Sequence, residues 1–389
     1  MLSIERNERL TRVGPNTPGG ALLRRYWQPL CAAVELTPER PKKRLTLLCE
    51  DLVVFREPDG SYGCVGEQCA HRRCSLYYGF VEEGGIRCPY HGWKYARDGR
   101  CIEQPFEPAG SPLKDEARQP AYAVQELAGL LFVYMGPLPA PLLPRWDVLA
   151  RRDGTRRIEI RPTLQCNWLQ IQENAVDTTH TYYLHGHMAK LRGMRHGGGE
   201  YYYRPILKYD FTVTEWGIEK RILYGGDQPE DGLWPPMIFP NMLRIPQGRI
   251  ENMHWRVPID DNRTRYVIMA FTPNDSGEPV RQETVPIEYM PSDLDQSGDY
   301  SLASFFSQDR MAWETQGAVL DRGRELLGAS DRGITLLRRM LDEQIAIVEK
   351  GGEPMAVVRD AEKNEMIAFT AHSVNRLGEK RREEMRTNG

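Results

Sequence analysis

Two short cysteine-histidine couplets have the residue types and the spacing of a metal site. Cys69 and His71 form the first couplet, Cys88 and His91 form the second, and the sixteen residues from Arg72 to Arg87 separate them. Two loops would then each supply one thiolate and one imidazole. Two thiolates on one iron and two imidazoles on the other are the ligands of a Rieske-type [2Fe-2S] cluster. The sequence therefore predicts that Cys69 and Cys88 bind one iron and that His71 and His91 bind the other.

A zinc site is the alternative, because two cysteines and two histidines are also common zinc ligands. Zinc fingers, however, group cysteine with cysteine and histidine with histidine, whereas the two types alternate here. The segment between the couplets is also rich in glycine and aromatic residues, which is not typical of a zinc-finger helix. Both features favour the diiron cluster.

The remaining cysteines indicate a cluster without a supporting disulfide. Cys74 lies in the first loop, but Tyr90 occupies the position in the second loop where a partner would stand. We therefore expect the lower-potential, disulfide-free kind of cluster. The other cysteines are scattered and are interpreted as small buried apolar residues in a reducing cytosol: Cys31, Cys49, Cys64, Cys101 and Cys166.

A second set of potential metal ligands lies further along the chain. Glu173, Asp177 and His180 follow i, i+4, i+7 spacing and would share one face of a helix. His185 would leave that face unless the helix unwinds over residues 182–184. Two histidines and one distant carboxylate form the facial triad of a mononuclear non-haem Fe(II) site, which keeps coordination positions open for O₂.

The distant carboxylate is assigned to Asp309, near the start of a predicted helix. An acidic residue at this place could instead cap the helix or complement its dipole without binding a metal. His187 is a rival to His185 as the second imidazole ligand. The other histidines are interpreted as ordinary polar or half-buried residues: His196, His254 and His372.

The bulk properties exclude several classes of protein. The 389 residues are enough for two domains with separate cores. The net charge of −3 and the pI of about 6.3 indicate neither a nucleic-acid-binding nor a membrane-binding surface. No stretch has the apolar length of a signal peptide or a membrane span, so we expect a soluble cytoplasmic protein. The charged tail, residues 376–389, is interpreted as a frayed end.

Turn signals and apolar runs divide the chain into parts. Residues 45–136 alternate short β-rich runs with turns, which predicts an all-β domain carrying the cluster on its loops. Residues 1–44 are expected to form an N-terminal helical segment packed on the other domain. The proline-dense residues 137–146 are typical of a linker. Residues 147–389 would form the second, catalytic domain.

The second domain is expected to combine helices with an antiparallel sheet, an α+β arrangement. Helices are predicted over residues 167–184, 301–327 and 334–350, and a hairpin turn over 260–262. Strands are predicted over residues 158–160, 201–209, 211–214, 237–245, 254–259 and 266–272.

The chain resembles the Rieske non-haem iron oxygenases, specifically their homomeric phthalate 4,5-dioxygenase-like branch. The resemblance covers nearly the whole length. It is carried by residues 7–15 and 24–29 at the amino terminus, by the second cluster loop 88–93, by Glu173, Asn174, Asp177, His180 and His185, by Gln308 and Asp309 with Glu314 and Gln316, and by residues 326–332.

This resemblance implies an all-β Rieske domain joined to a helix-grip (START-like) catalytic domain, assembled as a homotrimer. It also implies that Asp309 is the third ligand of the mononuclear Fe(II). Asp177 would bridge two subunits by accepting hydrogen bonds from His180 and from His91 of the neighbouring chain, so that electrons cross the boundary. Asn174 would assist at the same site.

The resemblance further implies that a separate NAD(P)H-dependent reductase, carrying flavin and a [2Fe-2S] cluster, or a ferredoxin passes electrons to this chain. The chain has no Gly-x-Gly-x-x-Gly fingerprint of its own, so the nicotinamide and flavin must bind to the partner. O₂ is then used in aromatic catabolism. The expected reaction is ring hydroxylation of a phthalate-like acid. The alternative is O-demethylation of a methoxylated, lignin-derived aromatic acid, with loss of formaldehyde.

A carboxylate substrate needs an arginine fork in a largely apolar site. Arg244 is the first candidate, followed by Arg204, Arg192 and Arg195. With 51 lysines and arginines in the chain, a solvated surface charge is the commoner role for any one of them. Residues 187–199 could form a lid over the iron or an ordinary surface loop.

Two hypotheses without oxygenase activity remain open. A Rieske electron-transfer protein would need only the first half of the chain, and it would leave the second ligand set unexplained. A ligand-binding module would use the helix-grip fold without catalysis. Metal analysis separates them from an oxygenase, which holds about three irons per chain where the alternatives hold about two.

Overall fold

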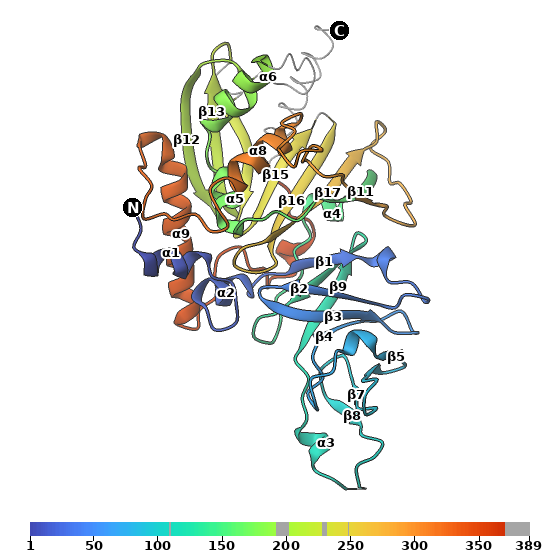
Figure 1. Ribbon diagram of the computed structural model, residues 1–389. Helices are drawn as coiled ribbons and strands as arrows, with labels where there is room; N and C mark the ends of the chain where they lie inside the picture. Colours follow the sequence, from blue (N-terminus) through green and yellow to red (C-terminus); the bar gives the residue numbers. More distant parts are fainter. Residues whose placement is uncertain (109, 192–201, 228–231, 248, 370–389) are drawn as a thin grey trace.

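The chain folds into two domains, which lie one above the other in Figure 1. The computed structural model describes residues 1–108, 110–191, 202–227, 232–247 and 249–369. The smaller, lower domain contains both cysteine-histidine couplets, and the larger, upper domain contains the second set of potential ligands. The expected combination of an all-β domain with an α+β domain is confirmed.

The smaller domain is built on two antiparallel sheets. Its six-stranded sheet has the order β1-β10-β9-β4-β3-β2, and a four-stranded sheet, β5-β6-β7-β8, extends below it (Figure 1). Short helices, α3 (Leu113–Glu116) and the 3₁₀ turn η2 (Leu76–Tyr78), lie between the strands. The strands are β1 (Gln28–Ala32), β2 (Lys42–Leu47), β3 (Glu50–Arg56), β4 (Tyr62–Gly66), β5 (Phe80–Glu82), β6 (Gly85–Arg87), β7 (Lys94–Tyr95), β8 (Cys101–Glu103), β9 (Ala121–Leu127) and β10 (Leu130–Tyr134).

The amino-terminal segment contributes to both domains. The helices α1 (Ile4–Thr11), which begins at the N-cap Ser3, and α2 (Pro18–Leu23) pack against α9 (Arg332–Glu349) of the larger domain. β1 pairs with β10 and therefore adds a strand to the smaller domain, although it lies within the segment expected to be helical. The domain limits drawn from the sequence otherwise stay predictions.

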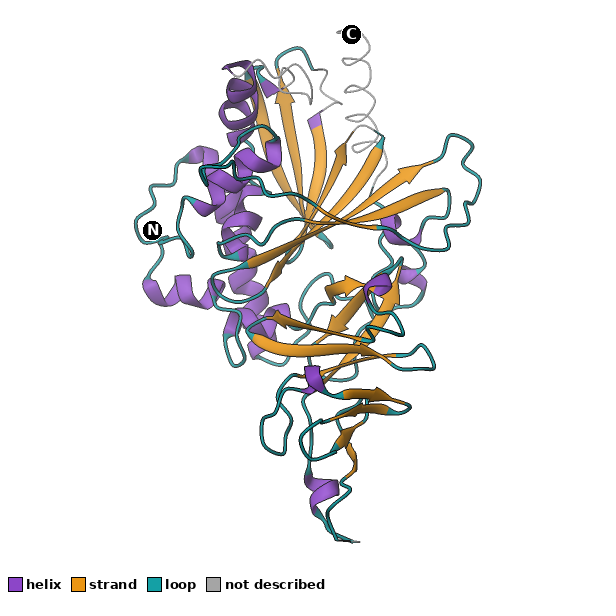
Figure 2. Ribbon diagram, turned by 45° about the vertical axis from the view of Figure 1, so that its right-hand side comes forward, coloured by secondary structure: helices purple, strands orange, loops and turns teal. Residues whose placement is uncertain are grey.

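The larger domain contains an eight-stranded sheet with the order β12-β13-β14-β15-β16-β17-β11-β18. All its pairs are antiparallel except β11 with β18, so the sheet is mixed rather than wholly antiparallel as expected. Figure 2 shows the strands fanning out beside the long helices. The strands are β11 (Gly154–Ile160), β12 (Ile206–Thr214), β13 (Gly217–Tyr224), β14 (Leu233–Ile238), β15 (Met242–Gln247), β16 (Ile250–Pro258), β17 (Thr264–Pro273) and β18 (Ile287–Tyr289).

Several strand predictions are wrong in detail. Residues 201–209 and 211–214 were expected as two strands, but β12 runs unbroken from Ile206. The single strand expected over 237–245 is two strands, because the chain turns at Phe239 and Pro240. β13 and β18 were not predicted, since charged residues interrupt their apolar pattern. The hairpin turn at 260–262, between β16 and β17, is confirmed.

Two of the three predicted long helices are shorter than expected. The helix predicted over 167–184 ends early: α5 covers Trp168–Asn174, residues 175–179 are not helical, and the chain then continues as the π-helix η3 (Thr181–His187) and α6 (Met188–Leu191). The helix predicted over 301–327 is only α8 (Phe305–Glu314). The third prediction is confirmed by α9. The remaining short helices are α4 (Asp147–Ala150), η1 (Ala33–Glu35), η5 (Ala329–Asp331) and η6 (Glu362–Asn364).

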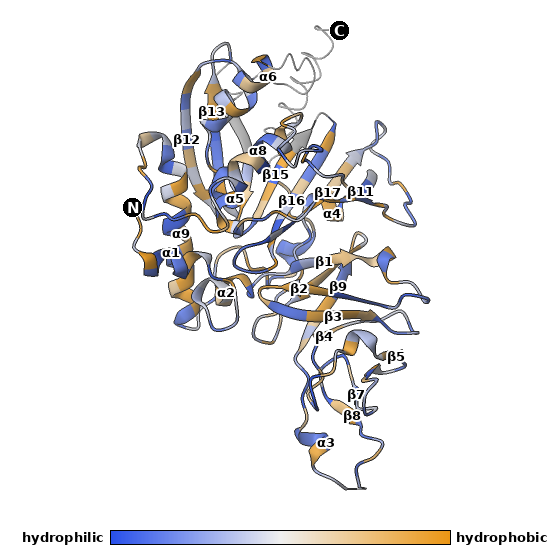
Figure 3. Cartoon of the chain, viewed as in Figure 1, coloured by the Kyte–Doolittle hydropathy of each residue, from blue (hydrophilic) through white to orange (hydrophobic). Residues whose placement is uncertain are grey.

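One apolar core joins the two domains. Phe132 on β10 packs edge-on against Trp255 on β16, with ring centroids 6.0 Å apart, and both belong to a single cluster of buried side chains. Figure 3 shows that α9 carries both hydrophobic and hydrophilic residues along its length. Its apolar stripe is buried in the same core through Leu337, Met340, Leu341, Ile345 and Val348. The iron-ligand candidates lie elsewhere: His180 directly precedes η3, His185 lies within η3, and Asp309 lies in α8.

Candidate metal centres and substrate site

Each cysteine-histidine couplet lies on a tight loop closed by backbone hydrogen bonds. Cys69 N donates to Cys74 O at 2.9 Å, and Cys88 N donates to Trp93 O at 2.8 Å. Gly92, whose φ of 73° is in the left-handed region, turns the second loop and donates to Cys88 O. Both cysteine side chains are buried, with 1% and 2% of their surface exposed. The loops thus hold two thiols inside the domain.

The two histidines of the couplets lie together at the surface of the loops. The rings of His71 and His91 are 4.6 Å apart between centroids, and His71 stacks on Trp93 at 4.3 Å. Burial and the neighbouring His91 lower the pKa of His71, which favours the neutral imidazole that a metal requires. Two buried thiols with two adjacent, partly exposed imidazoles fit a [2Fe-2S] cluster ligated by the predicted four residues.

The cysteines outside the cluster are only partly as expected. None of the eight cysteines, Cys74 included, forms a disulfide. Cys49, however, is exposed, and the prediction that it is buried is wrong. It sits in the turn between β2 and β3 with a φ of 64°, which leaves its side chain outside the core.

The second ligand set converges on one point. Donor atoms of His180, His185 and Asp309 all lie within 4.8 Å of one another, and within the described ranges no other group of three or more such side chains does so. Asp309 Oδ1 is 3.4 Å from His185 Nε2 and 3.8 Å from His180 Nε2. His187 instead contacts the rings of Tyr183 and Tyr203. Two imidazoles and one carboxylate on one side of a common point fit a single Fe(II) with open positions.

The π-helix explains how His180 and His185 meet. A π-turn places residues i and i+5 above one another, whereas an α-turn would rotate them apart. The two rings are 5.2 Å apart between centroids. The helix therefore unwinds over 182–184 as expected, because a π-helix has more residues per turn than an α-helix; a further break, over residues 175–179, precedes it. Gly186 is required because a Cβ there would lie 2.6 Å from Tyr203 N.

Neighbouring polar side chains orient the triad. Gln308 Oε1 is 3.0 Å from His185 Nδ1, and Asn174 Nδ2 donates to Asp309 Oδ1 at 3.4 Å. Asp177 Oδ1 lies 3.8 Å from His180 Nδ1, which is too long for a hydrogen bond but close for a charge. Both histidines can therefore offer Nε2 to the metal. A polar contact to the ring nitrogen that does not bind the metal fixes the tautomer and the ring position of a histidine ligand.

Asp177 is held at the edge of the site and keeps part of its side chain exposed. Its Oδ1 accepts from Thr179 N at 2.9 Å and from His180 N at 3.3 Å, and 26% of the side chain is exposed. Burial raises its pKa, but the His180 imidazole and these N–H donors outweigh burial and lower the pKa to about 2. Asp177 is therefore ionised at neutral pH.

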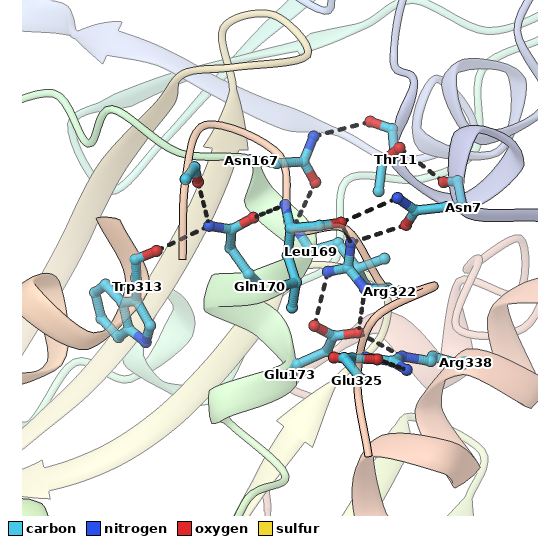
Figure 4. A network of polar contacts seen from close by, with 12 residues as sticks. Asn7, Thr11, Asn167, Leu169, Gln170, Glu173, Trp313, Arg322, Glu325 and Arg338 are labelled. Carbon is cyan, nitrogen blue, oxygen red and sulfur yellow. Dashed lines mark hydrogen bonds and ion pairs between the residues drawn. The ribbon is translucent and has the colours of Figure 1, made fainter. Parts of the chain in front are cut away.

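Glu173, although it precedes these residues in the same pattern, lies in a separate ionic network (Figure 4). Its carboxylate accepts from Arg322 at 2.9 and 2.7 Å and from Arg338 at 2.6 Å. Arg338 also pairs with Glu325 at 2.7 and 2.9 Å. All of these groups are largely buried. The network ties α5 to α9 and to the segment before it, and so fixes the helix that leads into His180.

The arginines selected for substrate binding are already paired. Arg244 is 1% exposed, and its guanidinium binds Asp147 and Glu251, each at 2.8 Å. Arg204 pairs with the buried Asp227 at 2.9 Å. The guanidinium groups of both residues are therefore already used by carboxylates of the protein and do not suit a substrate carboxylate. The remaining candidates and predictions fall outside the described residues: Arg192, Arg195, His196, the lid beyond residue 191, His372 and the tail 376–389.

Sequence reasoning missed two buried polar residues on the large sheet, Lys220 and Arg256, and interpreted a third, His254, as an ordinary polar or half-buried histidine. Lys220 on β13 is buried, and burial together with the charge of Arg256 lowers its pKa to about 7. His254 and Arg256 on β16 are also buried, and His254 Nδ1 is 2.8 Å from Tyr266 Oη. The available signal was the alternation His254-Trp255-Arg256, which places two polar residues on one face of a strand.

Known proteins show the same architecture. The Rieske [2Fe-2S] domain family matches residues 26–123, and the LigXa C-terminal domain-like family matches residues 279–386. The oxygenase in a ferredoxin complex of carbazole 1,9a-dioxygenase superposes with a TM-score of 0.62 at 22% identity, covering 87% of this chain and 94% of that one. NdmA of Pseudomonas putida CBB5 gives 0.58 at 21% identity, covering 85% and 93%. The fold is that of a Rieske non-haem iron oxygenase.

Similarity to curated proteins extends over almost the whole chain. The 5,5'-dehydrodivanillate O-demethylase oxygenase subunit of Sphingobium sp. is 39% identical, covering 94% of this chain and 86% of that protein. The phenoxybenzoate dioxygenase subunit alpha of Ectopseudomonas oleovorans is 36% identical (90% and 87%), and the phthalate 4,5-dioxygenase oxygenase subunit of Pseudomonas putida is 31% identical (95% and 92%). The chain belongs to the oxygenase subunits of multicomponent Rieske oxygenases.

Family membership settles the cofactors and the class of reaction. The chain carries a Rieske [2Fe-2S] cluster and an Fe(II), so the zinc alternative is wrong. It is an oxidoreductase that uses O₂ and electrons supplied by another protein. No helix in the described ranges is long and apolar enough to cross a membrane.

Proposed function

We propose that the chain oxygenates an aromatic carboxylic acid at the site formed by His180, His185 and Asp309. The convergence of these three side chains carries the proposal, because an electron-transfer protein or a simple binding module would have no need of it. The Fe(II) supplies O₂ activation and the cluster supplies electrons. The buried guanidinium of Arg256, which is close enough to Asp309 for the two charges to interact, favours an anionic substrate over a neutral one.

The reaction on this acid has two candidates. Ring hydroxylation is supported by the similarity to phthalate and phenoxybenzoate dioxygenase subunits. O-demethylation is supported by the 39% identity to an O-demethylase subunit. The same triad serves both reactions, so the position of the substrate relative to the iron decides between them.

The protein side chains have separable tasks in either reaction. His180, His185 and Asp309 hold the metal on one side and leave the other side to the reactants. Gln308 and Asn174 keep two of these ligands in place. His185 and Asp309 are largely buried, which limits the access of water to the reacting carbon.

We also propose a homotrimer in which electrons cross between subunits through Asp177. Within one chain the cluster loops near β7 lie in the lower domain and the triad near α8 lies in the upper domain (Figure 1). Asp177 is ionised, contacts His180, and keeps part of its carboxylate exposed. His91 is partly exposed as well. A carboxylate so placed can accept a hydrogen bond from the His91 imidazole of an adjacent subunit.

The electron donor is proposed to be a separate NAD(P)H-dependent reductase with flavin and a [2Fe-2S] cluster, or a ferredoxin. The carbazole 1,9a-dioxygenase oxygenase, which shares the fold, is described in complex with a ferredoxin. The lack of disulfides among the eight cysteines supports a reducing compartment, the cytoplasm.

One experiment tests the proposed function directly. The protein is purified without oxygen, its iron is counted, and the reduced protein is mixed with O₂ and a panel of phthalates and methoxybenzoates. About three irons per chain and a product from at least one acid are expected. A diol identifies ring hydroxylation, and formaldehyde identifies O-demethylation. Two irons per chain with no product from any acid would contradict the proposal.

A further inference from the structure

Arg256 is a buried cation without a counter-ion. Arg256 is 1% exposed, and its Nε and Nη1 atoms have no hydrogen-bond partner. No carboxylate of the described residues forms an ion pair with it, in contrast to Arg244, which binds two. Buried arginines are normally paired, because an isolated charge loses its hydration without compensation.

Strand geometry places Arg256 on the face of the large sheet that carries the iron ligands. Side chains alternate along β16, so Trp255 faces the core shared by the two domains and Arg256 faces the opposite way. Arg244 pairs across the sheet with Met253, which lies on the Trp255 face. The choice of Arg244 from the sequence therefore pointed to the wrong face.

Aromatic contacts connect Arg256 to the helix that holds Asp309. Its guanidinium carbon lies 5.3 Å from the ring centroid of Tyr266, its cross-strand neighbour. Tyr266 in turn packs on Phe306 and Trp313 of α8, with centroids 5.1 and 6.0 Å away. Phe306 and Trp313 flank Asp309 in that helix. The charge of Asp309 is close enough to act on the pKa of Arg256, although burial is the larger effect and lowers it.

A second unpartnered donor or acceptor lies beside Arg256. His254, two residues earlier on the same face, uses Nδ1 to contact Tyr266 Oη, while its buried Nε2 has no partner. Burial and the charges of Arg256, Arg161 and Arg244 lower the pKa of His254 well below its usual value, so it is neutral. With iron bound, the negative charge of Asp309 is compensated by the metal. The excess positive charge at Arg256 then remains.

We propose that Arg256 binds the carboxylate of the substrate through Nε and Nη1, and that His254 contacts the same group through Nε2. This inference rests on the proposed function, and it assigns the residue that selects acids over neutral analogues. A planar guanidinium can bind a carboxylate with two parallel hydrogen bonds, which also fixes the direction of the aromatic ring.

Binding of acids and their amides tests the assignment without any turnover. Benzoate, phthalate and 3-methoxybenzoate are titrated into the iron-loaded protein by calorimetry, each beside its primary amide. Arg256→Met keeps the volume but removes the charge, Arg256→Lys keeps the charge, and the exposed Arg249→Met is the matched control. Arg256→Met is expected to weaken acid binding by about 10- to 100-fold and to leave amide binding nearly unchanged. The Lys variant recovers part of the loss.

Thermal unfolding separates a binding role from a structural one. Without ligand, Arg256→Met should unfold at the same or a higher temperature, because it removes an uncompensated buried charge. With acid present, it should lose the stabilisation that the wild type shows. A lower unfolding temperature together with an unchanged preference for acids would overturn the assignment. So would a wild type that binds none of the three acids.

The outcomes also separate this inference from the proposed function. If the wild type converts an aromatic acid but Arg256→Met prefers acids to amides as strongly as the wild type does, the proposed oxygenase function is supported and the proposed role of Arg256 is wrong. If no aromatic acid is converted, the proposed function falls whatever the binding data show.

Discussion

Nδ1 of His185 lies 3.0 Å from Oε1 of Gln308, the residue directly before Asp309 in α8. An amide oxygen can only accept, so this contact places the proton of His185 on Nδ1 and leaves Nε2 for the metal. This one side-chain contact links two proposed iron ligands, His185 and Asp309, that lie far apart in the sequence.

Replacing Gln308 with Leu should weaken iron binding without affecting the cluster. The substitution removes the acceptor that orients His185, and such second contacts typically change metal affinity by about 10- to 100-fold. Iron retained after dialysis against a chelator measures the effect, while visible absorbance of the [2Fe-2S] cluster should stay constant. Gln316→Leu, at an exposed position beyond α8, is the control. Equal iron retention in both variants would show that Gln308 has no such role.

Replacing Asp177 with Asn should abolish coupled turnover while iron and cluster are retained. The change keeps the shape but removes the charge that is proposed to link His180 with His91 of the neighbouring subunit. Steady-state product formation should fall to background, although the isolated reductase still reduces the cluster. Asp275→Asn, at an exposed side chain, should keep full activity. Wild-type rates in the Asp177 variant would contradict the electron route.

Asp177→Asn should also change how iron binding depends on pH. In the iron-free protein, burial lowers the pKa of His180, but the carboxylates of Asp177 and Asp309 outweigh it and raise the pKa above its usual value. Iron requires the neutral imidazole, so loading decreases as the pH falls through this raised pKa. Asp177→Asn removes one carboxylate and should move the midpoint of iron loading to lower pH. Equilibrium loading between pH 5 and 8 checks this.

Two results would count against that explanation. A midpoint that stays in place would show that Asp177 does not act on His180. A midpoint that rises would show that Asp177 stabilises the bound metal more than it stabilises the proton. Asp210→Asn, on the exposed strand β12, should leave the midpoint where it is in the wild type.

The reduction potential of the cluster should depend on Tyr95. Its hydroxyl lies 3.1 Å from Sγ of Cys69 inside the domain. A hydrogen bond to a ligand sulfur stabilises the added electron, so Tyr95→Phe should lower the potential. A redox titration followed by electron paramagnetic resonance measures the shift. Tyr77→Phe, in the same domain, is the control. A potential that is unchanged or higher in Tyr95→Phe would rule out this hydrogen bond as a determinant.

Local chemistry allowed the candidate metal ligands to be predicted from the sequence, and the structure brings them together. The alternation of Cys69 and His71 with Cys88 and His91 depends only on two adjacent loops, and the structure brings these loops together. The structure brings His180 and His185 together as predicted, and the unwinding expected between them takes the form of a π-helix. A π-helix has no strong sequence signal, because it depends on what packs around it.

Residues that act through tertiary pairing were harder to predict. Arg244 was selected as an arginine near apolar residues, but its face of the sheet and its partners Asp147 and Glu251 follow from the strand register. The position of Arg256 on the opposite face depends on the same register. A shift of one residue along a strand reverses which side chains face the iron, and a single sequence does not fix that shift.

The buried pair of Glu173 with Arg322 should contribute strongly to the stability of the larger domain. Glu173→Gln leaves the Arg322 guanidinium without a charged partner inside the protein, and breaking a buried ion pair typically costs about 3–5 kcal/mol. The midpoint of urea unfolding, followed by tryptophan fluorescence, should fall accordingly. Glu343→Gln breaks an exposed contact with Arg339 at 3.7 Å and should change stability by less than about 1 kcal/mol. If both variants unfold at the same urea concentration, the network in Figure 4 does not hold α5 in place, and the position of His180 must depend on the packing of the π-helix alone.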